Sequence, residues 1–450
     1  MIVIDHVRCA YCGGCVSVCP VEALSLEETR LEVSDECIDC GDCTSACPVG
    51  ALSSPQAAPL QRETPFRREY DLVVIGAGPG GSTAAHAAAQ AGLSVLLLEK
   101  RQEIGSPVRC AEGVGHETLA SFIEPDRRWI AAEVKRAEII TVSGEATQTL
   151  RVEGGLGYIL ERRVFDRRLA ERAAEAGAEV RVKTAASGLL MENGRVCGVR
   201  IRHGDYMGAK GELEVSARIV IGADGVESLA GRWAGLPLGL PLQDTMVCVQ
   251  YLLAGIDMDP ECNYFTISQE LAPGGYIWAF PKGHGRANVG LGVQADLWES
   301  ASDKLPARGD PGPGEGAVLG FLTRFIESNP GLERGYPVTL IAGNVPVATS
   351  PARLVTDGFM LVGDAARQVD PLTGGGIINA MTAGRLAASV AVKAIAAKDV
   401  SAEYLARYES LCEQYIGRKN QRNYRLRAKF SSARRTDARF VRAFALAASG

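Results

Sequence analysis

The first 50 residues carry two copies of one cysteine pattern. Cys-x2-Cys-x2-Cys-x3-Cys-Pro runs from Cys9 to Pro20, and again from Cys37 to Pro48. Three thiolates at this spacing can wrap one face of an iron–sulfur cubane, and the fourth thiolate of each run reaches the other cluster. The pattern therefore predicts two [4Fe–4S] clusters. The expected ligands are Cys9, Cys12, Cys15 and Cys47 for one cluster, and Cys37, Cys40, Cys43 and Cys19 for the other.

A pair of zinc sites is the alternative, because Cys-x2-Cys also binds zinc. The doubled pattern resembles the bacterial two-cluster ferredoxin, and the resemblance covers residues 1–55. Residues 1–60 hold nine acidic and two basic side chains, a net charge of −7, whereas the whole chain has −5. An acidic module of this kind suits docking of an electron-transfer partner.

Composition limits the remaining classes of protein. The chain has 450 residues, 46% hydrophobic and 22% charged, which is ordinary for two to four globular domains. No apolar run reaches about 18 residues, and the N-terminus lacks a signal-peptide pattern, so a cytoplasmic location is expected. The net charge of −5 is too small to argue for or against a nucleic-acid partner, and no nucleic acid is expected because no RNA- or DNA-binding motif is present.

A second motif begins after a proline-containing stretch. Residues 56–68 predict a linker, with a docked connector as the equal alternative. A strand then runs into Gly76-x-Gly78-x-Gly80-Gly81, an alanine-rich stretch and a strand ending at Glu99. This order is the dinucleotide-binding fingerprint, in which loop amides bind pyrophosphate and the acidic residue binds a ribose hydroxyl. The alternative is a purely structural glycine turn.

Two later stretches are predicted as strands that end in Asp224-Gly225 and in Gly363-Asp364. The order of these motifs resembles the hydroxylase-like FAD family, and this resemblance implies FAD rather than NAD. That resemblance implies that Asp364 binds the ribityl chain, with a simple helix cap as the alternative. It further implies these FAD contacts: Gly376 and Ile377 near the isoalloxazine, Arg162 of an Arg-x-x-Phe-Asp pattern, and Ala186 on the adenine side.

Two further stretches resemble the geranylgeranyl reductase family. They are Pro107-Val-Arg-Cys110-Ala-Glu-Gly113 and a match to Pro-x-x-Tyr-x-Trp-x-Phe-Pro-x-Gly-x-Gly, which begins at Pro273. The resemblance covers roughly residues 70–430. It implies an enzyme that saturates the isoprenoid C=C bonds of membrane ether-lipid precursors. It also places Cys110 beside the flavin, with Ala111 and Gly113 in the same loop.

The chemistry of alkene reduction agrees with this resemblance. Reduced flavin delivers a hydride to one carbon, a proton goes to the other, and the cationic transition state needs electron-rich, dry walls. Tyr276, Trp278 and Phe280 alternate at period two, so a strand would present them on one face as a wall for a prenyl chain. Ordinary β-sheet core is the alternative. We take Cys110, Tyr276 and Trp278 as the candidate catalytic residues, and the other four cysteines outside the doubled pattern as packing.

A single fingerprint favours the absence of a separate NAD(P)H domain. A low-potential electron donor, a ferredoxin or similar protein, is then expected to feed the clusters. Near the signature, His284, Lys282 and Arg286, together with Arg109, are weaker candidates for contact with a phosphate head group; solvated side chains are the alternative.

The C-terminal end is basic. Residues 418–442 hold ten Lys and Arg side chains and one acid, with aromatic residues interleaved. Such a segment suits a peripheral contact with the anionic inner face of a membrane. A solvated helical face is the equal alternative.

The sequence thus predicts an α+β ferredoxin domain, followed by an α/β FAD-binding Rossmann domain of the hydroxylase-like type, an antiparallel-sheet substrate domain and a helical C-terminal region. The expected bounds are 1–55, 56–68 for the linker, 69–400 with an insertion at about 130–345, and 401–450. The predicted function is flavin-dependent reduction of geranylgeranyl chains. The rivals are a dehydrogenase linked to quinone or electron-transfer flavoprotein, a non-catalytic electron-transfer subunit, and chlorophyll-type geranylgeranyl reduction.

Overall fold

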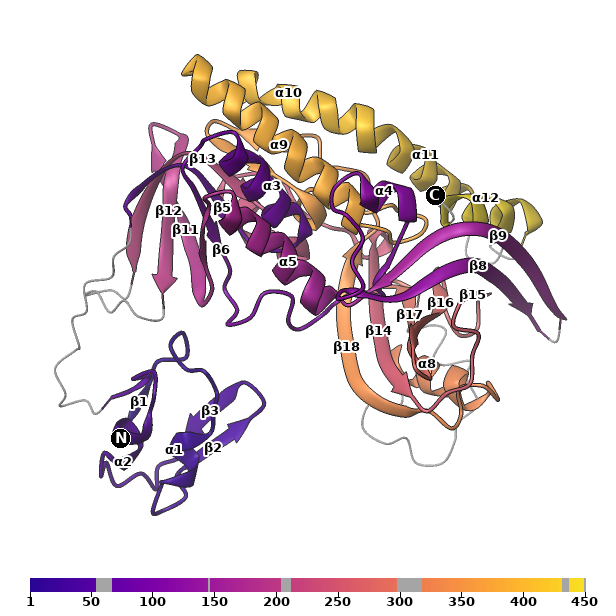
Figure 1. The fold of residues 1–450 in the computed structure, drawn as a ribbon, viewed down its shortest axis with the longest axis horizontal. Coiled ribbons are helices and arrows are strands. Elements are labelled where there is room, and N and C mark those ends of the chain that lie inside the picture. Colours follow the sequence, from indigo (N-terminus) through magenta and orange to yellow (C-terminus); the bar gives the residue numbers. More distant parts are fainter. Residues whose placement is uncertain (54–66, 145, 204–211, 298–317, 431–436, 449–450) are drawn as a thin grey trace.

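The computed structural model describes residues 1–53, 67–144, 146–203, 212–297, 318–430 and 437–448. The protein consists of an N-terminal module, two large sheets whose strands alternate along the chain, and a row of C-terminal helices (Figure 1). Most of the predicted linker lies outside the described residues, as do Arg434 and Arg435 of the basic C-terminal stretch.

The N-terminal module has two similar halves. In each half a glycine in the left-handed region, Gly13 or Gly41, starts a helical turn that carries the third cysteine of the pattern. Short strands close the module, and their ends pair as β1 with β4 and as β2 with β3. Its elements are β1 (Val3–Ile4), α1 (Gly14–Ser17), β2 (Leu24–Glu27), β3 (Arg30–Val33), α2 (Asp42–Ala46) and β4 (Leu52–Ser53).

The first large sheet has the strand order β10-β6-β5-β13-β12-β11, with β20 pairing to β13. Strands β10, β6, β5, the end of β13 and β20 are parallel, whereas β11, β12 and the start of β13 form an antiparallel extension. The bounds are β5 (Glu69–Ile75), β6 (Val95–Leu98), β10 (Glu179–Arg181), β11 (Thr184–Glu192), β12 (Arg195–His203), β13 (Leu213–Gly222), β19 (Val355–Thr356) and β20 (Phe359–Leu361).

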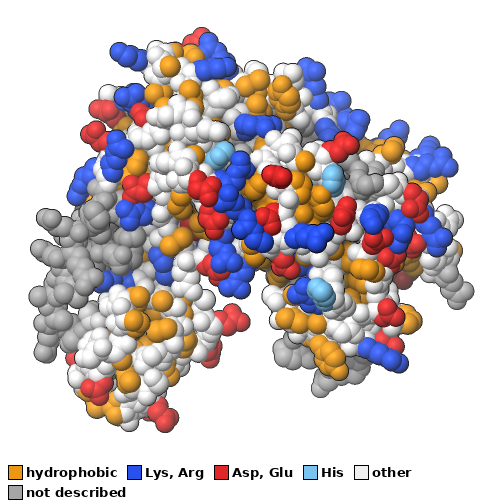
Figure 2. All heavy atoms as spheres, in the orientation of Figure 1, with side chains coloured by type: hydrophobic (Ala, Val, Ile, Leu, Met, Phe, Trp, Pro, Cys, Tyr) orange, Lys and Arg blue, Asp and Glu red, His pale blue; other side chains and the backbone are white. Residues whose placement is uncertain are grey.

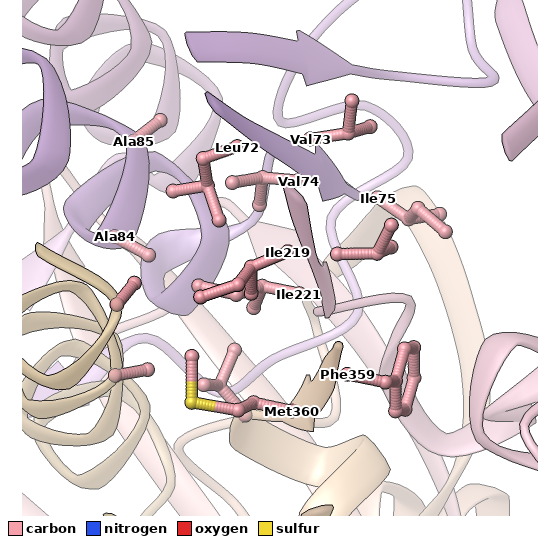
Figure 3. Close-up of a cluster of buried hydrophobic side chains, with 14 of the residues drawn as sticks. Leu72, Val73, Val74, Ile75, Ala84, Ala85, Ile219, Ile221, Phe359 and Met360 are labelled. Atoms are coloured by element: carbon pink, nitrogen blue, oxygen red, sulfur yellow. The ribbon is translucent and has the colours of Figure 1, made fainter. Parts of the chain in front are cut away.

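Helices cover this sheet because its strands are apolar on both faces. Figure 3 shows Leu72 of β5 and Ile219 of β13 beside Ala84 of α3. Helix α9 crosses α3 closely: a Cβ at Gly384 would lie 2.2 Å from the Gly80 carbonyl oxygen. The covering helices are α3 (Pro79–Gln90), α5 (Arg162–Glu175), α9 (Ile377–Ala397) and α10 (Ala402–Cys412).

Among the described residues, α9 is the one helix long and apolar enough to cross a membrane by length and composition. Its Ala383, Ala387 and Ala391 are buried in the core of the first sheet.

The second large sheet has the order β18-β14-β17-β16-β15-β8-β9-β7. It is antiparallel except where β15 runs parallel to β8. The chain builds it in two visits, because residues 161–244 return to the first sheet and its helices between β9 and β14. The predicted insertion at about 130–345 is therefore made of two separate segments of the sequence, which come together in one sheet. The bounds are β7 (Gly113–Val114), β8 (Ile130–Ser143), β9 (Ala146–Leu160), β14 (Thr245–Ala254), β15 (Cys262–Ser268), β16 (Tyr276–Gly283), β17 (Arg286–Gln294) and β18 (Tyr336–Pro346).

The C-terminal helices run from the first sheet to the second (Figure 1). A π-helical turn at Glu413–Gly417 joins α10 to α11 (Arg418–Lys429), and α12 (Ala438–Ala448) packs on the second sheet through Phe440 and Phe444. Figure 2 shows Lys and Arg side chains gathered over this row of helices. The other short helices are α4 (His116–Ala120), α6 (Leu229–Trp233) and α8 (Val318–Glu327).

Candidate active site

The loop between β5 and α3 approaches a neighbouring strand closely enough to require glycine. Gly76 has φ +103°, and a Cβ there would lie 2.4 Å from the Ala223 carbonyl oxygen. A Cβ at Gly81 would lie 1.9 Å from the Gly76 carbonyl oxygen, so this position is closed to any side chain. The N-terminus of α3 therefore opens directly onto the loop, which is the arrangement that binds pyrophosphate.

Carboxylates border this loop. Glu99 follows β6 and accepts hydrogen bonds from the Ala77 amide at 3.2 Å and the Arg101 amide at 2.9 Å. Asp224 follows β13; one of its oxygens accepts from the Ala230 amide at 2.9 Å, and the other is buried with no partner among the described residues. Burial raises the pKa of Asp224. An unpartnered buried oxygen at this point fits a polar ligand group.

Arg162 begins α5 and points into the same space. Its guanidinium makes a bidentate ion pair with Asp166, with both N···O distances 2.7 Å. Asp364 lies after β20; burial raises its pKa, and the charge of Arg162 opposes that rise. Gly376 lies beside Asp364, since a Cβ at Gly376 would be 3.5 Å from the Asp364 Oδ1 atom. Ile377 begins α9, whose N-terminus faces this group.

A continuous cavity of about 450 Å³ joins these residues. Nearly all the cofactor and catalytic residues predicted from the sequence line it. They are Gly76, Gly78, Gly80, Gly81, Glu99, Cys110, Ala111, Arg162, Ala186, Tyr276, Trp278, Asp364, Gly376 and Ile377. Gly113 lies apart from this lining: it begins β7, and a Cβ there would meet the Phe280 ring at 3.3 Å.

The far part of the cavity has an aromatic wall. The Tyr276 ring lies 5.9 Å from the Trp278 ring and 5.1 Å from the Phe444 ring, centroid to centroid, in edge-to-face geometry. Glycines on β17 make room for this wall, because a Cβ at Gly290 would lie 2.6 Å from Trp278. Phe440 also lines the cavity. Tyr276 and Trp278 therefore belong to the sheet and also line the cavity. Phe280 packs against the Phe265 ring instead.

Cys110 lies in the loop of residues 107–113, which we call the flavin loop, at the point where this loop meets the aromatic wall. Burial raises the pKa of its thiol, and nearby Arg162 opposes the rise. The thiol sulfur accepts a hydrogen bond from the Glu112 amide at 3.1 Å. Cys248 lines the cavity as well, and burial raises its pKa to about 12. Our prediction that Cys248 serves only packing did not anticipate this position.

Several site residues carry no sequence motif and were missed. Gln250 donates to the Cys110 carbonyl at 3.2 Å and accepts from the Trp278 indole at 2.8 Å. Lys282, which the sequence offered as a head-group contact, is buried against Glu112 at 2.6 Å, so that expectation is wrong. The alternation of side chains along a strand shows which face of the sheet Gln250 and Lys282 occupy. It does not show which residues they contact. His284 is exposed and Arg109 is half exposed, and both remain available to solvent.

One of the two cysteine sets predicted for the N-terminal module lies around a shared space. Cys19, Cys37, Cys40 and Cys43 border one small cavity. Three of the thiol sulfurs accept hydrogen bonds from backbone amides. The Tyr11 amide donates to the Cys9 sulfur at 3.4 Å, the Ala23 amide to the Cys19 sulfur at 3.3 Å and the Ala51 amide to the Cys47 sulfur at 3.1 Å. Such bonds fit thiolates that hold a cluster. Within the described ranges, no three His, Cys, Asp or Glu side chains group as ligands of a single ion would.

The module touches the FAD-binding part at the turn between β10 and β11. There the Lys183 ammonium donates to the Cys9 carbonyl at 2.6 Å and lies 5.0 Å from the centre of the Tyr11 ring. The next residue of the chain, Thr184, lines the main cavity. The backbone of Cys9, a predicted cluster ligand, is therefore joined to the rim of this cavity by one side chain.

The fold and site define an FAD-dependent oxidoreductase joined to a two-cluster iron–sulfur module. Three family models match: a 4Fe–4S dicluster domain at residues 1–48, an FAD-dependent oxidoreductase at 71–241 and a geranylgeranyl reductase catalytic domain at 244–306. The cofactors are FAD and two [4Fe–4S] clusters, and the zinc alternative is wrong.

Known relatives agree along most of the chain. Digeranylgeranylglycerophospholipid reductase 2 of Methanococcoides burtonii is 48% identical over 355 residues, which are 78% of this chain and 82% of the relative. The digeranylgeranylglycerophospholipid reductase of Methanosarcina acetivorans is 50% identical over 338 residues, 75% of this chain and 78% of the relative. The chain belongs to the geranylgeranyl reductase family.

Solved structures extend the match to the fold. A geranylgeranyl bacteriochlorophyll reductase-like protein from Thermoplasma acidophilum has a TM-score of 0.72 and 42% identity, and covers 81% of this chain and 89% of its own. A flavin-dependent brominase has a TM-score of 0.61 at 19% identity, covering 85% of this chain and 94% of its own, and shows the shared fold alone.

Proposed function

We propose that this chain hydrogenates the C=C bonds of geranylgeranyl chains in membrane ether-lipid precursors. The observation that carries the proposal is the single cavity, which runs from the dinucleotide loop at Gly76 to the aromatic wall of Tyr276, Trp278 and Phe444. A long apolar chain needs a dry, elongated space, and the flavin loop borders the same space. The printed names of the Methanococcoides and Methanosarcina relatives support this substrate class.

The side chains of the wall suit the electron demand of the reaction. FAD, when bound, supplies the hydride that an isoprenoid double bond requires. Tyr276 and Trp278 present electron-rich rings beside the space for the alkene, which favours developing positive charge and excludes water. The Tyr276 hydroxyl donates to the Thr373 carbonyl, and this bond fixes its ring.

Cys110 is our candidate for the group that holds the proton. Its raised pKa keeps the thiol protonated through the neutral range, so a proton is present at the loop between the flavin side and the wall. A buried thiol without charge also keeps this part of the cavity apolar. In this proposal Cys110, Tyr276 and Trp278 are the catalytic residues.

Electrons enter through the acidic module in this proposal. The clusters, when present, carry single electrons from a low-potential donor, and Figure 2 shows Asp and Glu side chains on the visible face of the module. Residues 1–60 hold a charge of −7 and the remaining chain about +2, so the module suits a basic donor and also the FAD-binding part. The donor is a ferredoxin or a similar protein.

The basic C-terminal helix is our proposed contact with the membrane surface. Helix α11 exposes five bases on one side: Arg418, Lys419, Arg422, Arg425 and Lys429. Its other side buries Asn420, Asn423 and Arg427 against the protein. Anionic lipids attract such a row of bases, and a membrane is where the substrate resides.

The test is direct analysis of the lipid product. The purified holoenzyme is reduced anaerobically with a chemical reductant and given a digeranylgeranyl ether lipid, and mass spectrometry then follows the lipid. We expect a gain of two hydrogens for each double bond reduced. An unchanged lipid beside a flavin that is reduced and reoxidised by quinone would favour the electron-transfer dehydrogenase instead. A chlorophyll-type prenyl substrate reduced in preference to the ether lipid would overturn the substrate class.

A further inference from the structure

Three successive residues of the flavin loop are held by side chains from three strands of the second sheet. Gln250 of β14 donates to the Cys110 carbonyl at 3.2 Å, and Asn288 of β17 donates to the Ala111 carbonyl at 3.1 Å. Lys282 of β16 donates to the Glu112 carboxylate at 2.6 Å. We call these three side chains, Gln250, Lys282 and Asn288, the loop clamp.

Glu112 is the point at which the bonds converge. Its Oε2 atom accepts from Lys282 at 2.6 Å and from Asn288 at 2.7 Å, and its Oε1 atom accepts from the Arg162 amide at 2.8 Å. The same carboxylate therefore joins the sheet to the start of α5. Glu112 also has φ +75°, in the left-handed region that side chains other than glycine rarely adopt.

Burial makes this network costly unless it is complete. The Lys282 side chain is 3% exposed and that of Glu112 is 5% exposed, and Gln250 and Asn288 are buried. A buried charge or amide without a partner is strongly unfavourable, so each member depends on the others. An apolar cluster could fill the same volume, whereas only polar groups can hold two successive backbone carbonyls and the next side-chain carboxylate at set distances.

The clamp also reaches the substrate wall. The Trp278 indole donates to the side-chain Oε1 atom of Gln250 at 2.8 Å, while the side-chain Nε2 atom of the same Gln250 donates to the Cys110 carbonyl. The position of the thiol is thus tied to the position of the wall through one side chain. Lys282 and Trp278 lie on the same strand, β16.

We propose that Gln250, Lys282 and Asn288 are positioning residues that hold Cys110 at a fixed place between the flavin side and the aromatic wall. They act through the loop: Lys282 and Asn288 lie outside the cavity lining, whereas Gln250 borders the cavity and also holds the Cys110 carbonyl. The role in alkene reduction rests on the proposed function, whereas the holding of the loop can be measured without any substrate.

The experiment compares two clamp variants with a matched control in the holoenzyme. Asn288→Leu removes the amide at similar size, and the double variant Glu112→Gln with Lys282→Met removes the buried pair without leaving a lone charge. The control Asn263→Leu makes the same change on β15 of the same sheet, outside the cavity lining. A neutral thiol reagent is added, and peptide mapping follows alkylation of Cys110, with Cys248 on β14 as the internal reference.

We expect Cys110 to be alkylated at least fivefold faster relative to Cys248 in both clamp variants, and at the wild-type ratio in the control. With the lipid substrate, kcat should fall at least tenfold while KM changes less than threefold. If either variant fails to fold, Gln250→Leu replaces it. Wild-type alkylation ratios in folded clamp variants would overturn the proposal, and equal changes in the control would reduce the clamp to general stability. An enzyme inactive on every lipid, but with the expected alkylation ratios, would overturn only the proposed function.

Discussion

At the residue scale, the protonation of Cys110 gives a dependence on pH. Its pKa is raised by burial, so the thiol stays protonated below and somewhat above the ordinary thiol value. If this thiol supplies the proton, kcat is flat through neutral pH and falls as the pH rises past the raised pKa.

Cys110→Ala should then lower kcat by about 100-fold, the low end of the range for a lost general acid, and should remove the alkaline fall. FAD should remain bound, because the variant keeps every other lining residue. Steady-state rates from pH 6 to pH 10 in wild type and variant are the measurement. A variant with the wild-type rate and the wild-type pH profile would show that the thiol only packs.

Gly76 gives a prediction for the cofactor. A Cβ 2.4 Å from the Ala223 carbonyl oxygen cannot be accommodated without moving a β-strand, and φ +103° is strained for alanine. Gly76→Ala should therefore reduce bound flavin to less than about a tenth of one per chain, since either the loop or the strand must shift. Absorbance of the purified protein measures it. Gly239→Ala is the control, because a Cβ there meets nothing within 4 Å and the residue lies outside the cavity lining.

At the scale of elements, helix α11 combines an anchor with a charged face. Arg427 is buried and donates to the Val347 carbonyl at 3.2 Å and to the Gln243 carbonyl and the Gln294 side chain at 3.0 Å. Arg427→Met should cost about 2–4 kcal/mol of unfolding free energy, because it removes the donor of these three hydrogen bonds and the positive charge that lies 3.9 Å from the Asp244 carboxylate. Arg425→Met, on the exposed side, should change it by less than about 0.5 kcal/mol. Denaturant unfolding tests both, and equal losses would contradict the anchor.

The exposed side of α11 gives a separate prediction. Replacing Arg418, Lys419 and Arg422 by Gln should weaken binding to vesicles with anionic lipid by about 1 kcal/mol for each base. Wild-type binding should also fall as salt rises, because salt screens exposed charges beyond about 8–10 Å. Vesicle sedimentation at several salt concentrations measures both effects. Binding by the triple variant equal to that of wild type would place the membrane contact elsewhere.

How far the sequence predicts these elements depends on the range of the interactions. The strand, glycine loop and helix at 69–90 form from neighbouring residues, and the structure has them as β5 and α3. The second sheet could not be foreseen as two visits of the chain, because the pairing of β8 with β15 joins residues more than 100 positions apart. In the sequence, Phe440 and Phe444 belong to a stretch that we interpreted as a basic surface segment. In the structure they line the cavity, because α12 packs on the second sheet through these two rings.

The same limit applies to the site. Sequence motifs identify residues that contact a cofactor, and almost all of the cofactor-binding residues predicted here line one cavity. Gln250, Asn288 and Glu112 hold the loop from distant strands, and a single polar residue in an apolar strand carries no signal of its partner. For Lys282 the sequence led to a wrong prediction. A lysine beside a glycine turn is usually exposed to solvent, but here its side chain is buried in an ion pair with Glu112.

At the scale of the whole molecule, two cofactor-binding parts share one chain. The Lys183 side chain links them, through its hydrogen bond to the Cys9 carbonyl and its contact with the Tyr11 ring. If electrons pass from the module to the flavin, the module is needed only with a protein donor. A small chemical reductant reaches the flavin without it.

The most direct test of this account removes residues 1–58 and compares the shortened enzyme with the full chain. Both receive the same geranylgeranyl lipid, with either a chemical reductant or a reduced low-potential ferredoxin, and the saturated product is quantified by mass spectrometry. With the chemical reductant, the two forms should give similar amounts of product. With reduced ferredoxin, only the full chain should give it at a substantial rate. Equal rates for both forms with ferredoxin, or with NADPH alone, would contradict the entry of electrons through the clusters.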